Sequence, residues 1–247
     1  MNKPLSKKRP WYQFGLLLVF AVVTLCAVAF AWLRYPLEQT RREIELAAEI
    51  EDLGGRVTWG GFTVERGTSG RSYIGAIDLT GANVPDLILA EIGSLPDLTH
   101  LYLNDANITD SGVEHLATLP RLKQLELSGT RVTDVGVHLL ASLTSLEVVK
   151  LECCPITDDA LKTLGKLQLL WMLHVDKTSV TDAGLDSLDT LRNLRTLGLR
   201  GTQLTDAGLE KLRRHDQLEM LFVEGTAVTD AGIEQFNGAL PNDPAMR

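Results

Sequence analysis

The sequence predicts an α/β solenoid in which short parallel strands form one layer and helices form the other. Three observations support this fold class. A 24-residue pattern fills residues 74–241 with seven consecutive units and no insertion or deletion. Each unit starts with apolar residues at alternate positions and continues with apolar residues three apart, which are the periods of a strand and a helix. One such unit cannot bury its apolar face alone, so the copies must stack.

The repeat can be written L-x-x-L-x-L-x-x-T-x-V-T-D-x-G-L-x-x-L-x-x-L. Its frame opens at Ile74, Leu98, Leu122, Leu146, Leu170, Leu194 and Leu218. The Thr of the Thr-Asp step can accept an N–H at the helix start, and the Asp favours the positive end of the helix dipole. The first unit reads Val84-Pro85-Asp86 instead. The recurrent glycine predicts that each helix packs closely on the strand layer, although Ala160 occupies the same position.

The solenoid should have a cover at its N-terminal end and a stop at the other. We expect residues 34–73 to form a linker and cap, with an amphipathic helix over 38–53 that ends at Gly54-Gly55. Residues 56–59 and 62–65 are expected to be two short strands of this cap. Residues 242–247 are expected to be a C-terminal tail. Because helices are bulkier than strands, the stack should curve, with the sheet on its concave face and the helices on its convex face.

An apolar segment precedes the expected cap. Residues 14–33 contain one clearly polar residue, Thr24, and twenty helical residues match a hydrocarbon layer of about 30 Å. Four Lys or Arg side chains lie in residues 1–13, which predicts a cytoplasmic basic tail and a single-pass signal anchor in the inner or plasma membrane. The repeats would then be periplasmic or extracellular. The alternative is a signal peptide cleaved near Ala29, with secretion of the body.

Charge and cysteine content exclude some classes of function. The net charge is −8, and residues 1–33 carry +4, so residues 34–247 carry −12. Lys and Arg are scattered through this acidic part, which argues against nucleic-acid binding. Three cysteines are too few for a disulfide scaffold. A bridge between the neighbours Cys153 and Cys154 would be strained.

The repeat unit resembles the leucine-rich repeat family. Its Thr-Asp-x-Gly-Leu step is similar to a bacterial, planctomycete-type 24-residue variant, in which a membrane segment and an L-G-G-R-V-like turn often precede the array, as Leu53–Val57 does here. The resemblance covers about residues 36–240 and implies a leucine-rich repeat solenoid. Many members carry Asn at the ninth position. This chain has Ala82, Ala106, Thr130, Cys154, Thr178, Thr202 and Thr226 there.

The same frame gives the E-C-C-P segment a structural interpretation. Cys154 takes the place of a repeat Thr, and Thr157-Asp158 is the helix start. Cys153 stands where Gly129 and Gly201 stand in other units, so we expect it to be the one departure from the scaffold. It could be a partly exposed thiol able to bridge to another chain.

Function is expected on the concave face, where the side chains between the buried leucines vary. A mixture of aromatic, Met and charged residues suits recognition of a protein or another macromolecule. The candidate partner-binding residues are His100, Tyr102, Asn104, Gln124, Glu126, Lys150, Glu152, Met172, His174, Asp176, Arg200, Met220, Phe222 and Glu224. We expect the groove to be centred on Tyr102, His174, Met220 and Phe222. Self-association in an architectural envelope protein is the alternative.

No enzyme motif is present, so we predict no catalytic residue and no cofactor. His174 and Asp176 share a strand face without a nearby nucleophile, and we expect them to be an exposed pair. Asp158-Asp159 offers too few ligands for calcium, and no metal site is expected. The predicted function is a membrane-anchored, non-catalytic binding module.

Overall fold

The computed structural model describes residues 38–60, 73–237 and 245–246. The chain divides into two compact units, residues 1–44 and 45–247, and a helix runs over residues 38–52. Within the described residues, no helix is both long and apolar enough to span a membrane. The expected anchor at 14–33, the basic tail at 1–13 and the expected strand at 62–65 lie outside the described residues.

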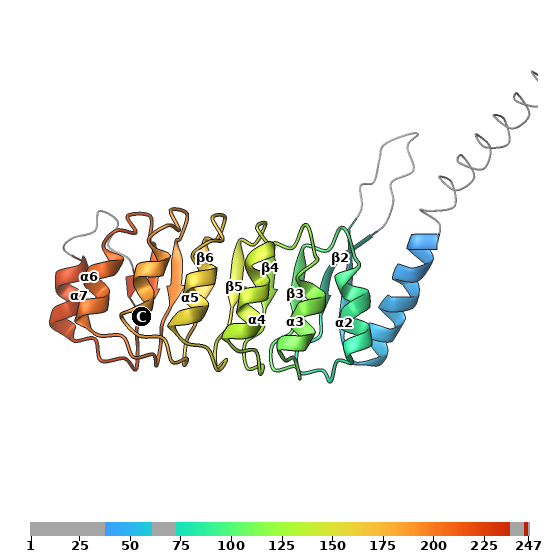
Figure 1. The fold of residues 1–247 in the computed structure, drawn as a ribbon, viewed down its shortest axis with the longest axis horizontal. Helices are drawn as coiled ribbons and strands as arrows, with labels where there is room; N and C mark the ends of the chain where they lie inside the picture. The colour runs from blue at the N-terminus through green and yellow to red at the C-terminus, as the bar shows by residue number, and fades with distance from the viewer. Residues whose placement is uncertain (1–37, 61–72, 238–244, 247) are drawn as a thin grey trace, which may run out of the picture. The chain divides into compact units, whose positions relative to one another are not determined.

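The strands of the second unit form one sheet in which spatial order equals chain order (Figure 1). Strand β1 pairs antiparallel with β2, and every later pair is parallel. From β2 to β8 the partners are 24 residues apart, such as Leu101 and Leu125, whereas β8 and β9 pair residues 25 apart. The described strands are β1 Arg56–Gly60, β2 Tyr73–Asp78, β3 His100–Tyr102, β4 Gln124–Glu126, β5 Val148–Lys150, β6 Met172–His174, β7 Thr196–Gly198, β8 Met220–Phe222 and β9 Ala245–Met246.

Helices cover one face of this sheet (Figure 1). They are α2 Asp86–Gly93, α3 Asp110–Leu116, α4 Asp134–Leu139 with its extension η1 Leu140–Ser142, α5 Asp158–Leu164, η2 Gly184–Leu188, α6 Asp206–Leu212 and α7 Asp230–Asn237. The fifth unit has a 3₁₀ helix, η2, where the others have an α-helix. Its apolar residues Leu185, Leu188 and Leu191 are three apart, a spacing that stays on one side of a 3₁₀ helix.

The core lies between the two layers and runs the length of the stack. The central leucine or valine of each repeat strand is fully buried, from Leu101 in β3 to Leu221 in β8. Leu46 and Ile50 from the 38–52 helix join this core near the first repeat, and Phe236 of α7 joins it in the last. Each buried aliphatic side chain contributes about 1.5–3 kcal/mol. The expected α/β repeat solenoid is therefore confirmed.

The Thr of the Thr-Asp step caps the helix start, as the sequence predicts. The Asp does not act mainly on its own helix. The hydroxyl oxygens of Thr133, Thr157 and Thr205 accept the backbone N–H two residues later. The Asp carboxylate instead contacts the next repeat. Asp110 accepts the backbone N–H of Thr133 at 2.8 Å through Oδ1 and the Thr133 hydroxyl at 2.7 Å through Oδ2. Equivalent pairs join Asp134 to Thr157, Asp158 to Thr181, Asp182 to Thr205 and Asp206 to Thr229.

These carboxylates also explain the recurrent glycine. The N–H of Gly136 donates to Asp110 Oδ1 at 3.0 Å, and a Cβ at Gly136 would lie 2.4 Å from the same oxygen. A Cβ at Gly208 would lie 2.3 Å from Asp182 Oδ1. For Gly136, Gly184, Gly208 and Gly232 the expected close packing on the strand layer is therefore not the main reason, because the nearest obstacle is the preceding Asp. At Gly112 the nearest atom belongs to Leu89 instead. Ala160 is tolerated with a longer contact of 3.2 Å to Asp134.

The two cysteines of the E-C-C-P segment are free thiols in different environments. Cys153 is exposed and has φ +58°, in the left-handed region that favours glycine. Asp105 and Lys177 hold the equivalent position with the same backbone conformation, so the expectation that Cys153 alone departs from the scaffold is wrong. Cys154 is buried and its Sγ donates to the Leu127 carbonyl oxygen at 3.1 Å. Burial raises the pKa of the Cys154 thiol, which disfavours its reactive thiolate.

Removing one inter-repeat carboxylate should measure how much it contributes. Asp134→Ala deletes the acceptor for two Thr157 donors and the Ala160 N–H, and we expect the free energy of unfolding to fall by about 2–3 kcal/mol. Asp86 occupies the same repeat position, yet it makes no hydrogen bond to the following repeat among the described residues. Asp86→Ala should therefore cost about 0.5 kcal/mol. Equal losses in urea denaturation of the two variants would contradict this role.

Candidate functional site

The candidate residues lie on the face of the sheet opposite the helices, which we call the sheet face. Parallel pairing aligns them in rows that cross the strands. The middle row runs Tyr102, Glu126, Lys150, His174, Gly198 and Phe222. Along each strand, the residue of this row lies between two buried core residues and points to the other face. The type of residue at this position differs from repeat to repeat.

The four residues expected at the centre of one groove form two separate groups. Tyr102 is in β3 and Phe222 is in β8, five strands away, which corresponds to about 24 Å at the usual strand spacing. Tyr102 stacks with His100 at a ring-centroid distance of 6.5 Å. Phe222 makes an edge contact with His174 at 5.7 Å. The four residues therefore lie in two parts of the sheet face, because they come from distant repeats.

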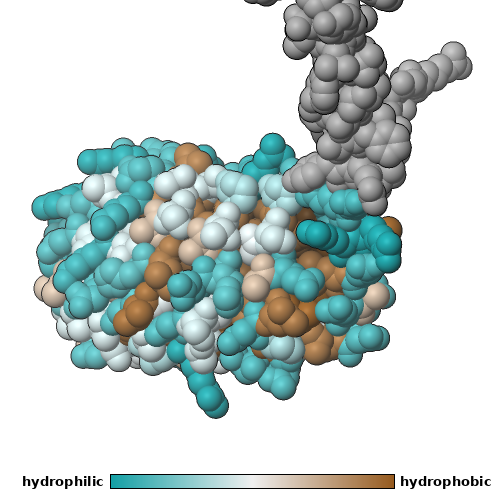
Figure 2. Space-filling view, turned by 45° about the vertical axis from the view of Figure 1, so that its right-hand side comes forward, coloured by the Kyte–Doolittle hydropathy of each residue, from teal (hydrophilic) through white to brown (hydrophobic). Residues whose placement is uncertain are grey.

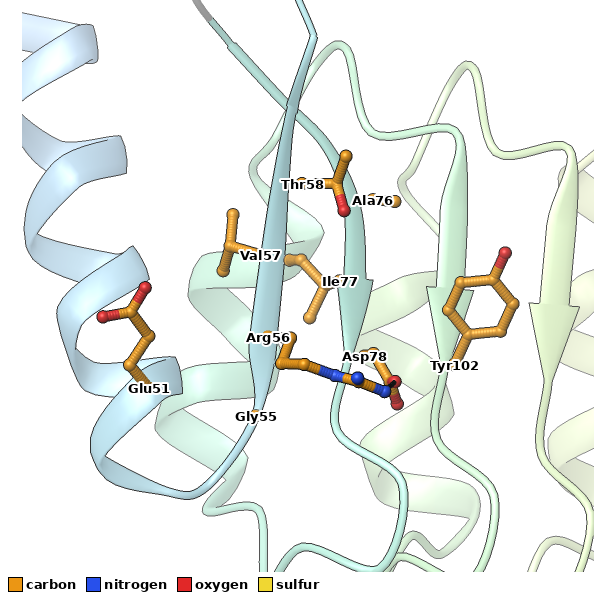
Figure 3. Close-up of a pocket in the computed structure, with 9 residues that line it drawn as sticks. All are labelled: Glu51, Gly55, Arg56, Val57, Thr58, Ala76, Ile77, Asp78 and Tyr102. Carbon is orange, nitrogen blue, oxygen red and sulfur yellow. Dashed lines mark hydrogen bonds and ion pairs between the residues drawn. The ribbon is translucent and has the colours of Figure 1, made fainter.

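The N-terminal end of the sheet face has a hollow of about 570 Å³ (Figure 3). Its lining includes Arg56 of β1, Asp78 of β2 and Tyr102 of β3. Arg56 Nη2 contacts Asp78 Oδ2 at 2.6 Å, with the Arg side chain 83% exposed. Burial tends to raise the pKa of Asp78, but the bonds from Arg56 and Thr80 outweigh it and hold that pKa below its ordinary value. The sequence frame did not reveal this hollow, because β1 lies outside the repeats.

The middle of the sheet face is organised by Glu126, whose side chain is buried. Its carboxylate accepts from Asn104 Nδ2 at 2.7 Å and Gln124 Nε2 at 2.8 Å, and it contacts Lys150 Nζ at 2.9 Å. Burial alone would raise the pKa of Glu126, but these three donors outweigh it and lower that pKa. Four candidate residues are therefore joined in one polar network.

The C-terminal part holds a second, denser cluster of candidate residues. His174 Nδ1 lies 2.9 Å from Glu152 Oε1 and 3.6 Å from Asp176 Oδ2. Asp176 is only 5% exposed, and the His174 side chain 13%. The expectation of an exposed His174–Asp176 pair is therefore wrong. Burial raises the pKa of Asp176 despite the nearby Arg200 N–H and His174.

Gly198 is the reason that this pair is buried. It is the one residue of the middle row without a side chain, and a Cβ there would lie 2.2 Å from Asp176 Oδ2 and 3.0 Å from the His174 ring. The side chains of His174, at the end of β6, and of Asp176, just after it, therefore occupy the space above Gly198 in β7. Gly198 was visible in the sequence as the fifth residue of its repeat, but its effect depends on neighbours in other repeats.

Arg200 and Phe222 form the outer edge of this cluster. The Arg200 guanidinium lies over the Phe222 ring, 4.1 Å from its centroid, and its Nε donates to Glu224 at 2.8 Å. Met220 in the same strand as Phe222 is 38% exposed. The edge of the cluster therefore presents a cationic, an aromatic and a flexible apolar side chain together.

Exposed apolar side chains are not confined to the sheet face. Leu87 in α2 is 70% exposed and Val135 in α4 is 64% exposed. The surface seen in Figure 2 has hydrophobic patches separated by hydrophilic side chains. Scattered exposed apolar side chains are normal on protein surfaces. The sheet face differs from the helix side in the change of residue type from one repeat to the next along its rows.

The Glu126 network predicts a pH-dependent stability. At pH 7, Glu126→Gln should lower the free energy of unfolding by about 1–3 kcal/mol, because three donors lose a charged acceptor. The folded pKa is the lower one, so the stabilisation is complete above the ordinary Glu value of about 4.3 and is lost as pH falls through the folded value. The wild type and the variant should therefore converge only once the pH falls below the lowered folded pKa of Glu126.

A surface ion pair supplies the matched control for this variant. Glu219 contacts Arg195 at 3.1 Å with both side chains more than half exposed, and Glu219→Gln should change stability by about 0.5 kcal/mol or less. Denaturant melts of both variants at several pH values make the comparison. A Glu126→Gln loss that stays constant down to pH 3 would contradict the assigned role of the carboxylate.

Comparison with known proteins agrees with this architecture. The family model described as Leucine Rich repeat matches residues 94–117, 142–165 and 190–212. No curated protein matches the chain. Internalin C2 from Listeria monocytogenes is 22% identical with a TM-score of 0.50, and the match covers 70% of this chain and 78% of that one.

Two further bacterial structures share the fold at the same TM-score of 0.50. An internalin from Listeria monocytogenes, InlF, is 22% identical over 69% of this chain and 52% of that one. A leucine-rich repeat protein from Leptospira interrogans is 19% identical over 67% of this chain and 40% of that one. Together with the observed strand–helix repeats, these matches show a leucine-rich repeat fold.

Proposed function

We propose that this chain is a non-catalytic binding module that holds a protein partner on its sheet face. The observation that carries the proposal is the contrast within each repeat. The leucines, the Thr-Asp step and the glycine recur, whereas the middle row changes from Tyr102 through Lys150 to Phe222. Repeat solenoids typically use this extended surface for recognition.

The C-terminal part of the sheet face is the proposed anchor. Phe222, Arg200 and Met220 combine aromatic, cationic and flexible apolar character in neighbouring repeats. Such residues dominate the binding energy of many interfaces. Glu152 adds negative charge to this part of the face, which favours a partner with a basic group at that place.

We also propose that residues 14–33 anchor the chain in the inner or plasma membrane, with the repeats on the exported side. The support is the apolar sequence and the preceding basic residues. Secretion after cleavage is the alternative for the same segment.

Site-specific crosslinking tests the binding face. A photo-crosslinking amino acid at Met220, an exposed sheet-face position, should give a discrete adduct with a partner in intact cells. Phe222→Ala in the same chain should reduce that adduct about tenfold, since an aromatic anchor contributes more than about 1 kcal/mol. The control position is Val135, which is exposed on the helix side.

The identity of the adduct decides between the alternatives. Adducts of equal yield at Met220 and Val135 would contradict a sheet-face site. An adduct made only of two copies of this chain would replace the partner proposal by self-association.

A reporter fused behind Arg247 tests the topology. An enzyme that folds only after export should be active in this fusion and inactive when residues 1–33 are removed. Membrane fractionation then separates anchoring from secretion, because a cleaved body would leave the membrane fraction. Activity of a cytoplasm-dependent reporter alone would contradict the proposed orientation.

A further inference from the structure

We propose that Glu152, His174 and Asp176 form a binding site for a divalent transition-metal ion of the Zn²⁺ class. The sequence shows no spacing that signals such a site, because its three donors come from two strand ends brought together by the stacking of repeats. This inference does not depend on the partner-binding proposal.

The donor atoms already converge. Glu152, His174 and Asp176 each offer one ligand atom, and these three atoms lie within 4.8 Å of one another. The His174 nitrogen is 2.9 Å from the Glu152 oxygen and 3.6 Å from the Asp176 oxygen. Tetrahedral ligands at about 2.05 Å from Zn²⁺ are separated by about 3.4 Å. Small side-chain rotations would bring the three atoms to this geometry, and the Glu152 side chain is 36% exposed and has room to adjust.

The two oxygens of Asp176 have different surroundings. Oδ1 accepts the backbone N–H of Arg200 at 2.9 Å, which fixes the orientation of the carboxylate. Oδ2 is buried and has no hydrogen-bond partner among the described residues, since His174 Nδ1 is too distant at 3.6 Å. A buried oxygen without a partner costs about 1–3 kcal/mol or more when charged. A cation between Oδ2 and Nδ1 would remove this cost.

The imidazole of His174 presents its Nδ1 atom to the two carboxylates. Its Nε2 atom is also buried and lacks a hydrogen-bond partner among the described residues. Metal binding needs neutral imidazole, so Nδ1 would give up its proton and Nε2 would carry the remaining one. The ring is held by its edge contact with Phe222, which keeps the binding nitrogen in place.

Arg200 is close to the cluster without filling the site. Its Nη1 is 3.9 Å from Asp176 Oδ1, on the oxygen that already has a donor. Glu224 and the Phe222 ring hold the rest of the guanidinium. Two carboxylates and a neutral imidazole would balance the charge of a divalent ion, while Arg200 and Glu224 balance each other.

The donor set selects the kind of ion. One imidazole nitrogen with two carboxylate oxygens suits Zn²⁺, Co²⁺ or Ni²⁺. Calcium requires six to eight oxygen ligands and magnesium prefers octahedral oxygen coordination, which three donors including a nitrogen do not supply. Three protein ligands leave a fourth position open for water or another ligand.

The test measures Zn²⁺ binding to the purified full chain in detergent micelles. Isothermal titration should show one saturable site, and Co²⁺ should give the visible absorption of a low-symmetry nitrogen and oxygen site. Asp176→Asn keeps the shape of the side chain and the Arg200 contact but removes the charged ligand atom. It should weaken Zn²⁺ binding about 100-fold or more, which exceeds the usual effect of changing an outer-sphere partner. His174→Gln should have the same effect.

Matched variants exclude other zinc ligands. His100→Gln changes a histidine on the same face whose Nδ1 pairs with Thr99, and Cys153→Ser removes the exposed thiol next to Glu152. Both should bind Zn²⁺ as the wild type does. Thermal melts should also show that Zn²⁺ raises the Tm of the wild type and leaves that of Asp176→Asn unchanged, with far-UV circular dichroism confirming that the variants fold.

The outcomes that overturn the site are specific. The proposal is wrong if the wild type shows no saturable binding below about 100 µM. It is also wrong if a folded Asp176→Asn or His174→Gln variant binds as tightly as the wild type. Loss of binding in Cys153→Ser would assign the ion to the thiol instead.

Discussion

The carboxylate that joins one repeat to the next is the interaction on which the rest of the structure depends. A solenoid has no contacts between distant repeats, so its register is set entirely by neighbour pairs. The N–H and the hydroxyl of Thr133 both donate to the Asp110 carboxylate, and these two bonds fix the position and the orientation of the following helix start. Their recurrence through Asp206 accompanies a constant spacing of 24 residues between the strand partners of these repeats. Apolar packing supplies most of the stabilisation, but it is less directional than two bonds to one carboxylate.

A fixed register allows the sheet face to vary. Backbone pairing and the buried leucines hold each strand, so residues between them can change without altering the fold. Gly198 shows the consequence, because the absence of one side chain lets Asp176 and His174 occupy the space above β7. The same row therefore contains an open hollow beside Tyr102, a closed polar network around Glu126 and a buried cluster at His174. The chemistry of the face depends on side-chain size as much as on charge.

Sequence periodicity was sufficient to predict the fold and the Thr caps, because both follow from residues close together in the chain. It could not predict the partner of each Asp, which lies 23 residues away at the start of the next helix. The burial of His174 and Asp176 was misjudged for the same reason. It depends on Gly198, Arg200 and Phe222, which come from the following two repeats. Alignment of the repeats gives the neighbours of a residue, but not the direction in which its side chain turns.

The E-C-C-P segment illustrates how position in the repeat assigns chemistry. Cys154 is buried with its Sγ bonded to a carbonyl oxygen, so it acts as a small core residue. Cys153 is exposed, but its left-handed backbone conformation is shared by Asp105 and Lys177 and requires no thiol. Glu152 is the residue of this segment that contacts the ionisable cluster, through His174 at 2.9 Å. A segment that suggests sulfur chemistry in the sequence thus contributes a carboxylate, because the strand end directs Glu152, and not its neighbours, toward the next repeat.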